Sequence, residues 1–165
     1  MFTRALFTTV MVAFLAVGCA SKKPSNDQDG ANGANGANNG LTLELNGDSD
    51  SNTAGGLQTV YFGFDSSTID SSTKDTLKNN AEFLKTNATV DVQVEGHCDE
   101  RGGRQYNLAL GERRAKTVRD YLVGLGVEAK RISVISYGNE RPVSEGHDES
   151  AWGKNRRGNF VVTAK

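Results

Sequence analysis

Residues 90–118 read VDVQVEGHCDERGGRQYNLALGERRAKTV, and this stretch decides the fold. Valines alternate with polar residues in the first six positions, which predicts a strand with one buried face. Gly96 ends this run, and Gly102 and Gly103 then mark a loop. After the loop, apolar residues recur every three or four positions. This spacing predicts a helix over residues 106–125 that packs against a core.

Two charged residues of this unit are candidates for binding a ligand. Asp99 follows the strand, in a loop where we expect an exposed side chain. On a helical projection, Arg114 falls beside the apolar stripe, at the edge of the core, whereas Arg113 falls opposite the stripe. Asp99 and Arg114 together could hold a ligand that carries both charges. They could equally form an internal ion pair or remain solvated.

The first 18 residues have the pattern of a signal peptide. Arg4 precedes an apolar run, and Gly18 precedes Cys19. The sequence LAVGC resembles a bacterial lipobox, although Leu15 stands one position earlier than the usual leucine. We therefore expect lipidation of Cys19, and several acyl chains would anchor the chain stably in a membrane. A plain signal peptide or an uncleaved anchor is the alternative. The absence of aspartate after the cysteine resembles outer-membrane sorting.

Residues 19–56 are predicted to form a flexible tether after the lipidated N-terminus. Their glycine, asparagine and serine content, as in GANGANGANNG over residues 30–40, is too polar to bury a core. Three leucines in residues 41–45 interrupt this composition. We expect no fixed structure there, and a partner-binding peptide is the alternative.

Residues 57–165 have the length of one domain. The whole chain has 19 Lys and Arg against 20 Asp and Glu, and no basic patch contains interleaved aromatic residues, so nucleic acid is not an expected partner. If Cys19 is lipidated, Cys98 is a lone thiol, and no intramolecular disulfide can form.

The rest of the domain alternates between strand and helix patterns. The first helix is predicted to be capped by Ser71 or Ser72 and the second to stop at Gly126. The predicted class is α+β, with a four-stranded mixed sheet and both long helices on one face. The predicted order is strand 59–64, helix 71–85, strand 90–95, helix 106–125, strand 132–136, a polar loop 137–155 with a helical turn near Ser150, and strand 159–163.

His97, Cys98 and Asp99 are residue types that serve in catalysis or metal binding. Adjacent residues at a strand end point in opposite directions, so His97 and Cys98 are poorly placed to form a hydrogen-bonded pair. His147 is the other histidine, and there is no second cluster of cysteine and histidine for zinc. The glycine-rich segments lack a phosphate-loop pattern. We therefore expect no catalytic residue, metal or cofactor.

Four segments together resemble one protein family. GHCDERGGRQYNLALGERRAKTVRDYL resembles the central motif of OmpA-like peptidoglycan-binding domains. VYFGFDSSTID, ISYGNERP and EGHDESAWGKNRRGNFVV resemble the peptidoglycan-associated lipoproteins (Pal) within that family. The resemblance covers about residues 58–164, and the lipobox agrees with it. It implies a β-α-β-α-β-β OmpA-like fold and a binding module without enzymatic activity.

The resemblance also implies a ligand and the residues that hold it. In this family the ligand is the diaminopimelate of peptidoglycan stem peptides, whose tip carries an ammonium and a carboxylate. Asp99 would accept hydrogen bonds from the charged tip, and Arg114 would pair with its carboxylate, preferably with two hydrogen bonds. The other residues that match the family's pocket are Phe64 and Asp65 at the end of the first strand, Leu110 as an apolar wall, and His97 at the periphery.

Position 98 departs from the family pattern. The residue before the aspartate is usually threonine, and this chain has Cys98. A thiol is a weak donor and acceptor, so any hydrogen bond that the threonine makes would be weaker here. Cys98 also adds an oxidisable group.

The resemblance finally implies a location and partners. It indicates an outer-membrane lipoprotein on the periplasmic face that tethers this membrane to the cell wall by non-covalent binding. It also implies a Tol-Pal system that acts in envelope integrity and cell division, with TolB competing for the domain surface. Two alternatives stay open. One is another OmpA-like envelope lipoprotein associated with secretion or motility, and the other is an envelope enzyme that uses His97 and Cys98.

Overall fold

The computed structural model describes residues 42–165. The predicted signal peptide, Cys19 and the first part of the predicted tether lie outside these residues. The predicted order of strands and helices is confirmed, and the turn predicted near Ser150 is a short helix. The elements are β1 (Val60–Tyr61), α1 (Ser71–Thr86), β2 (Asp91–His97), α2 (Arg104–Gly124), the 3₁₀ turn η1 (Ala129–Arg131), β3 (Ile132–Gly138), α3 (Glu149–Asn155) and β4 (Arg157–Ala164).

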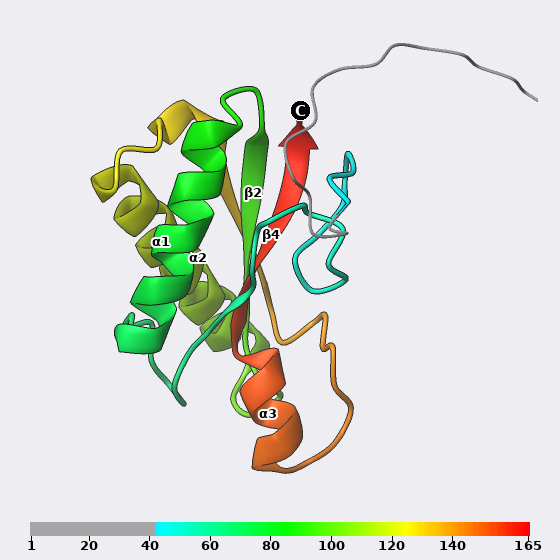
Figure 1. The fold of residues 1–165 in the computed structure, drawn as a ribbon. Coiled ribbons are helices and arrows are strands. Elements are labelled where there is room, and N and C mark those ends of the chain that lie inside the picture. The colour runs from blue at the N-terminus through cyan, green and yellow to red at the C-terminus, as the bar shows by residue number, and fades with distance from the viewer. Residues whose placement is uncertain (1–41) are drawn as a thin grey trace, which may run out of the picture. The chain divides into compact units, whose positions relative to one another are not determined.

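The four strands form one mixed sheet in the order β1-β4-β2-β3. β2 and β3 run parallel, whereas β4 is antiparallel to both of its neighbours, β1 and β2. The two long helices α1 and α2 lie on the same face of the sheet, as predicted (Figure 1). β2 is therefore a central strand, and the loop that follows it emerges between neighbours on both sides.

The core lies between this sheet and the two long helices. Alternate residues of β2 enter it, as the valine pattern predicts, because successive side chains of a strand point to opposite faces. Helix residues spaced three or four apart meet them. The buried members include Leu77 and Leu84 of α1, Val92 and Val94 of β2, Val118 and Leu122 of α2, and Phe160 and Val162 of β4.

Several element boundaries differ from the predicted ones. β1 has two residues where six were predicted, because its partner β4 pairs with it only through Arg157 and Gly158. Neither serine caps α1. The cap is Asp70, whose Oδ1 accepts a 2.7 Å hydrogen bond from the backbone amide of Thr73. β2 continues past Gly96 to His97 through an irregularity in register.

Residues 42–56, the N-terminal strap, belong to the folded domain, which differs from the prediction of a flexible tether up to residue 56. The backbone amides of Asn46 and Ser49 donate at 2.8 and 2.9 Å to carbonyls of β4. Ala54 is fully buried in the core. The polar composition of the strap misled the prediction, because main-chain hydrogen bonds to a strand edge do not depend on side-chain type.

Within residues 42–165, no helix combines the length and the apolar character needed to cross a membrane.

Candidate functional site

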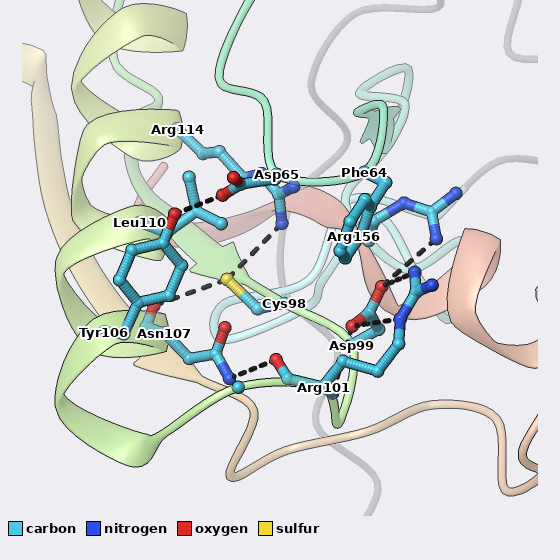
Figure 2. A pocket seen from close by; sticks show the side chains of 11 residues that line it. Phe64, Asp65, Cys98, Asp99, Arg101, Tyr106, Asn107, Leu110, Arg114 and Arg156 are labelled. Carbon is cyan, nitrogen blue, oxygen red and sulfur yellow. Dashed lines mark hydrogen bonds and ion pairs between the residues drawn. The ribbon is translucent and has the colours of Figure 1, made fainter.

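A cavity of about 150 Å³ opens where the end of β2 meets the start of α2 (Figure 2). Five of the six predicted site residues line it, from three separate parts of the chain, and His97 does not. The full lining consists of Phe64, Asp65, Cys98, Asp99, Arg101, Gly102, Tyr106, Asn107, Leu110, Arg114 and Arg156.

The carboxylate of Asp99 lies at the floor of this cavity. Its side chain is 4 % exposed, so the prediction of an exposed loop residue is wrong. Arg101 contacts both carboxylate oxygens, from Nη2 at 2.6 Å and from Nε at 3.2 Å. Nη1 of Arg156 donates to it at 3.2 Å. Burial alone raises the pKa of Asp99, but these hydrogen bonds outweigh burial and hold the pKa below its usual value.

Arg114 is fully buried, where the sequence predicted a position at the edge of the core. Its guanidinium donates to backbone carbonyls at 2.8 Å to Ser66, 2.7 Å to His97 and 3.0 Å to Gly63. A fourth contact joins Nη1 to Sγ of Cys98 at 3.4 Å. Burial lowers the pKa of Arg114 from its usual value.

These contacts limit what Arg114 can offer a ligand. A guanidinium has five N–H donors, and the four contacts use all but about one of them. The predicted two-point contact with a carboxylate would require Arg114 to give up at least one of these four contacts. In this structure Arg114 mainly ties the end of β2 to the loop that follows β1.

Two further arginines in the cavity were not predicted. Arg101 is stacked between Phe64 and Trp152, with its guanidinium carbon 4.0 Å from the centre of each ring. Arg156 is 57 positions after Asp99 in the sequence and reaches the cavity from the end of α3. Figure 2 shows both guanidinium groups meeting at the Asp99 carboxylate. Only the fold brings Arg156 there, so no local sequence signal could have found it.

The opposite wall of the cavity combines apolar and polar groups. Leu110 lines it from α2, whereas Phe64 is an exposed aromatic ring on the side of Arg101. The hydroxyl of Tyr106 donates to Asp65, and this hydrogen bond raises the pKa of Tyr106. Asp65 has φ of 52°, a left-handed conformation that aspartate tolerates better than most residues. The cavity therefore offers both signs of charge beside an apolar surface.

Cys98 and His97 occupy different environments. Sγ of Cys98 faces α2 and donates to the carbonyl of Asn107 at 3.3 Å, and burial raises the pKa of this thiol. The His97 ring lies outside the cavity lining, is 1 % exposed and stacks on Tyr137. Its Nε2 is 3.4 Å from Glu95. Among residues 42–165, no hydrogen bond joins the His97 and Cys98 side chains.

Comparison with known proteins places these features in context. The OmpA family matches residues 61–156. The chain is 45% identical, over 87% of both chains, to a peptidoglycan-associated lipoprotein of Pseudomonas aeruginosa. A protein of the same name from Mesorhizobium japonicum is 44% identical over 94% of this chain and 90% of its own. The crystal structure of the peptidoglycan-associated lipoprotein from Burkholderia pseudomallei matches with a TM-score of 0.61 and 41% identity, over 63% of this chain and 88% of that one.

Proposed function

Because the chain belongs to the OmpA family and, within it, to the peptidoglycan-associated lipoproteins, we propose that its cavity binds peptidoglycan without catalysing a reaction on it. The proposed ligand is the diaminopimelate tip of a stem peptide. This tip ends in one carbon that carries both an ammonium and a carboxylate.

The observation that carries this proposal is a buried carboxylate surrounded by guanidinium groups in one cavity. Asp99 can accept hydrogen bonds from an ammonium, and the neighbouring arginines attract a carboxylate. A buried charge is stable only when it is paired, so a ligand with a single charge would leave one partner uncompensated. A tip with both charges matches the cavity better than either charge alone.

The remaining walls suit the carbon chain behind such a tip. Leu110 and Phe64 offer apolar surface, and Asp65 with Tyr106 offers polar groups at the rim. In this arrangement Arg114 contributes its positive charge and one free N–H, while its backbone hydrogen bonds hold the cavity in shape. His97 supports the site from behind through its carbonyl rather than its ring.

We further propose how binding is used. Lipid on Cys19 would hold one end of the chain in the outer membrane, and the domain on the periplasmic side would hold the cell wall reversibly. Anchoring confines the domain near its ligand and raises the effective concentration, so a weak single contact suffices. TolB and other Tol proteins are the proposed protein partners, and envelope integrity and cell division are the proposed processes.

Co-sedimentation with purified sacculi tests the cavity assignment. We expect Asp99→Asn and Phe64→Ala each to weaken binding by about tenfold, or about 1.4 kcal/mol. Tyr61→Ala is the matched control for Phe64→Ala, because Tyr61 is a similarly exposed aromatic residue that does not line the cavity. Arg114 is left intact, since its replacement would remove four contacts that hold the fold.

Two results would overturn the proposal. One is sedimentation of both folded variants like the unaltered chain, with folding checked by thermal denaturation. The other is release of soluble fragments from sacculi by the unaltered chain, which would indicate catalysis. Excess soluble stem peptide with diaminopimelate should release the bound protein.

A further inference from the structure

Arg101 occupies the place on Asp99 that an incoming ammonium would need. Its Nε and Nη2 pair with the two carboxylate oxygens as a fork, at 3.2 and 2.6 Å. Its backbone amide also donates to Oδ1 at 3.1 Å. The best acceptor in the cavity is therefore already engaged by a side chain of the same loop.

The two arginines on Asp99 differ in how firmly they are held. Arg156 has an 8 % exposed side chain that also donates to the carbonyl of Phe62 at 3.0 Å and pairs with Glu149. Arg101 has a 32 % exposed side chain, and no backbone carbonyl accepts from its guanidinium within residues 42–165. Arg156 is thus held by a backbone carbonyl and a second carboxylate as well as by Asp99, whereas Arg101 is partly exposed at the cavity mouth and its other ionic contact, to Glu149, is 3.9 Å long.

Arg101 also has donors to spare. Two of its five N–H groups point to Asp99, so about three remain for another acceptor. Arg114 has about one. Phe64 and Trp152 cover the two faces of the planar Arg101 guanidinium. The N–H donors lie at its edge, which the two rings leave uncovered. The accessible fork of the cavity is therefore that of Arg101.

We propose that Arg101 is exchanged between Asp99 and the ligand. On binding, the ligand's ammonium takes the Asp99 carboxylate, and Arg101 turns its fork to the ligand's carboxylate. This inference rests on the proposed function and adds the device that makes it selective. A tip with both charges leaves every charge paired, whereas a tip with an ammonium alone displaces Arg101 and leaves it only Glu149, a carboxylate 3.9 Å from its Nη2 that is already paired with Arg156.

Three stem tripeptides that differ only at the tip test this exchange by calorimetric titration of the full chain in detergent. They carry diaminopimelate, diaminopimelate with its free carboxyl amidated, or lysine. For the unaltered chain we expect diaminopimelate to bind about tenfold or more tightly than the other two, which present an ammonium without a carboxylate.

Arg101→Gln should act differently on the diaminopimelate peptide and the lysine peptide. Binding of the diaminopimelate peptide should weaken about tenfold, because its carboxylate loses a charged partner. Binding of the lysine peptide should stay constant or strengthen, because the competing cation has left Asp99. A merely structural defect would weaken both. In Arg101→Lys the affinity for the lysine peptide should stay as low as in the unaltered chain, because the new lysine keeps a positive charge beside Asp99. The control is Arg104→Gln, because Arg104 pairs with Glu140 outside the cavity.

The outcomes separate the two proposals. If the unaltered chain binds none of the peptides, the proposed function fails. If it prefers the diaminopimelate peptide and Arg101→Gln keeps the same ratio between that peptide and the lysine peptide, only the exchange is overturned. Equal weakening of both peptides by Arg101→Gln overturns it as well.

Discussion

Gly96 of β2 and Gly111 of α2 meet backbone to backbone. A Cβ on Gly111 would lie 2.7 Å from the carbonyl oxygen of Gly96, and one on Gly96 would overlap the carbonyl oxygen of Gly111. Neither residue has room for a side chain, so the backbone of the helix packs directly against the backbone of the strand. Arg114, one turn further along α2, reaches the end of β2 as a result.

Gly111→Ala should therefore destabilise the domain by about 3 kcal/mol, since the added methyl group would push α2 away from β2. Gly124→Ala, on the same helix, is the control, because a Cβ there would meet no atom within 4 Å. It should leave stability unchanged or raise it by about 0.5–1 kcal/mol through higher helix propensity. Urea denaturation measures both, and equal effects would contradict the close approach.

Cys98→Thr should stabilise the domain. Sγ lies 3.3 Å from the carbonyl of Asn107 and 3.4 Å from Nη1 of Arg114. A hydroxyl is a better donor and a better acceptor than a thiol at both positions. We expect a gain of about 0.5–1.5 kcal/mol in the free energy of unfolding. Cys98→Ala, which removes both contacts, should lower stability, and a threonine variant no more stable than the alanine variant would refute this reasoning.

Acidification should weaken the fold through His97. Burial lowers the pKa of His97, and Arg157 acts in the same direction, whereas Glu95 and Asp50 oppose the shift without reversing it. The unfolded chain therefore binds the proton more readily than the folded one. This contribution is fully present above the unfolded pKa of about 6.5 and is lost as the pH falls below it.

Denaturation series at pH 7.5 and 5.5 check this dependence. Stability of the unaltered chain should fall between these values more steeply than that of His97→Gln. Comparing the two slopes cancels His147, whose pKa is raised by Glu100 and whose effect on stability has the opposite sign. If stability changes equally with pH in the unaltered chain and in His97→Gln, His97 is not the source of the pH dependence. The buried carboxylates Glu95 and Asp99 also have lowered pKa values, and the stability that they contribute is lost only at lower pH, below the unfolded pKa of a carboxyl group.

The N-terminal strap should contribute to stability through Asp50. Its Oδ2 accepts from Nε of Arg157 at 2.6 Å, and the Arg157 side chain is almost fully buried. Asp50→Asn keeps the shape but leaves a buried guanidinium without its counter-ion, which should cost about 3 kcal/mol. Asp75→Asn is the control, since Asp75 pairs with Lys78 in solvent and should matter little. A thermal melt that does not separate the two variants would show that the strap is dispensable.

Local periodicity was sufficient to predict the order of the elements. The valine alternation in β2 and the apolar stripe of α2 are signals within one element, and each element buries one face as predicted. The family motif indicated Phe64, Asp65, Asp99, Leu110 and Arg114, which the fold brings to one cavity. The lengths of edge elements such as β1 depend on partners elsewhere in the chain, and the pattern overestimated them.

Other features depend on distant contacts and could not be predicted. Asp99 can be buried because Arg156, at the end of α3, pairs with its carboxylate. Arg114 can be buried because three backbone carbonyls accept hydrogen bonds from its guanidinium. A helical projection takes into account only the residues of one helix and therefore cannot show contacts with distant segments. The family resemblance likewise did not reveal that Arg101 already occupies Asp99.

The N-terminal strap also determines how the domain responds to a pull on the chain ahead of residue 42. Tension would first load the hydrogen bonds to the carbonyls of Thr42 and Leu43, then those from Asn46 and Ser49 to β4, and then the pair between Asp50 and Arg157. The strap spans about 15 residues, so peeling it off would lengthen the chain by about 50 Å. The hydrogen bonds that hold Arg114 and Asp99 in the cavity involve no residue of the strap. Under tension the strap would thus detach from β4 before the cavity deforms.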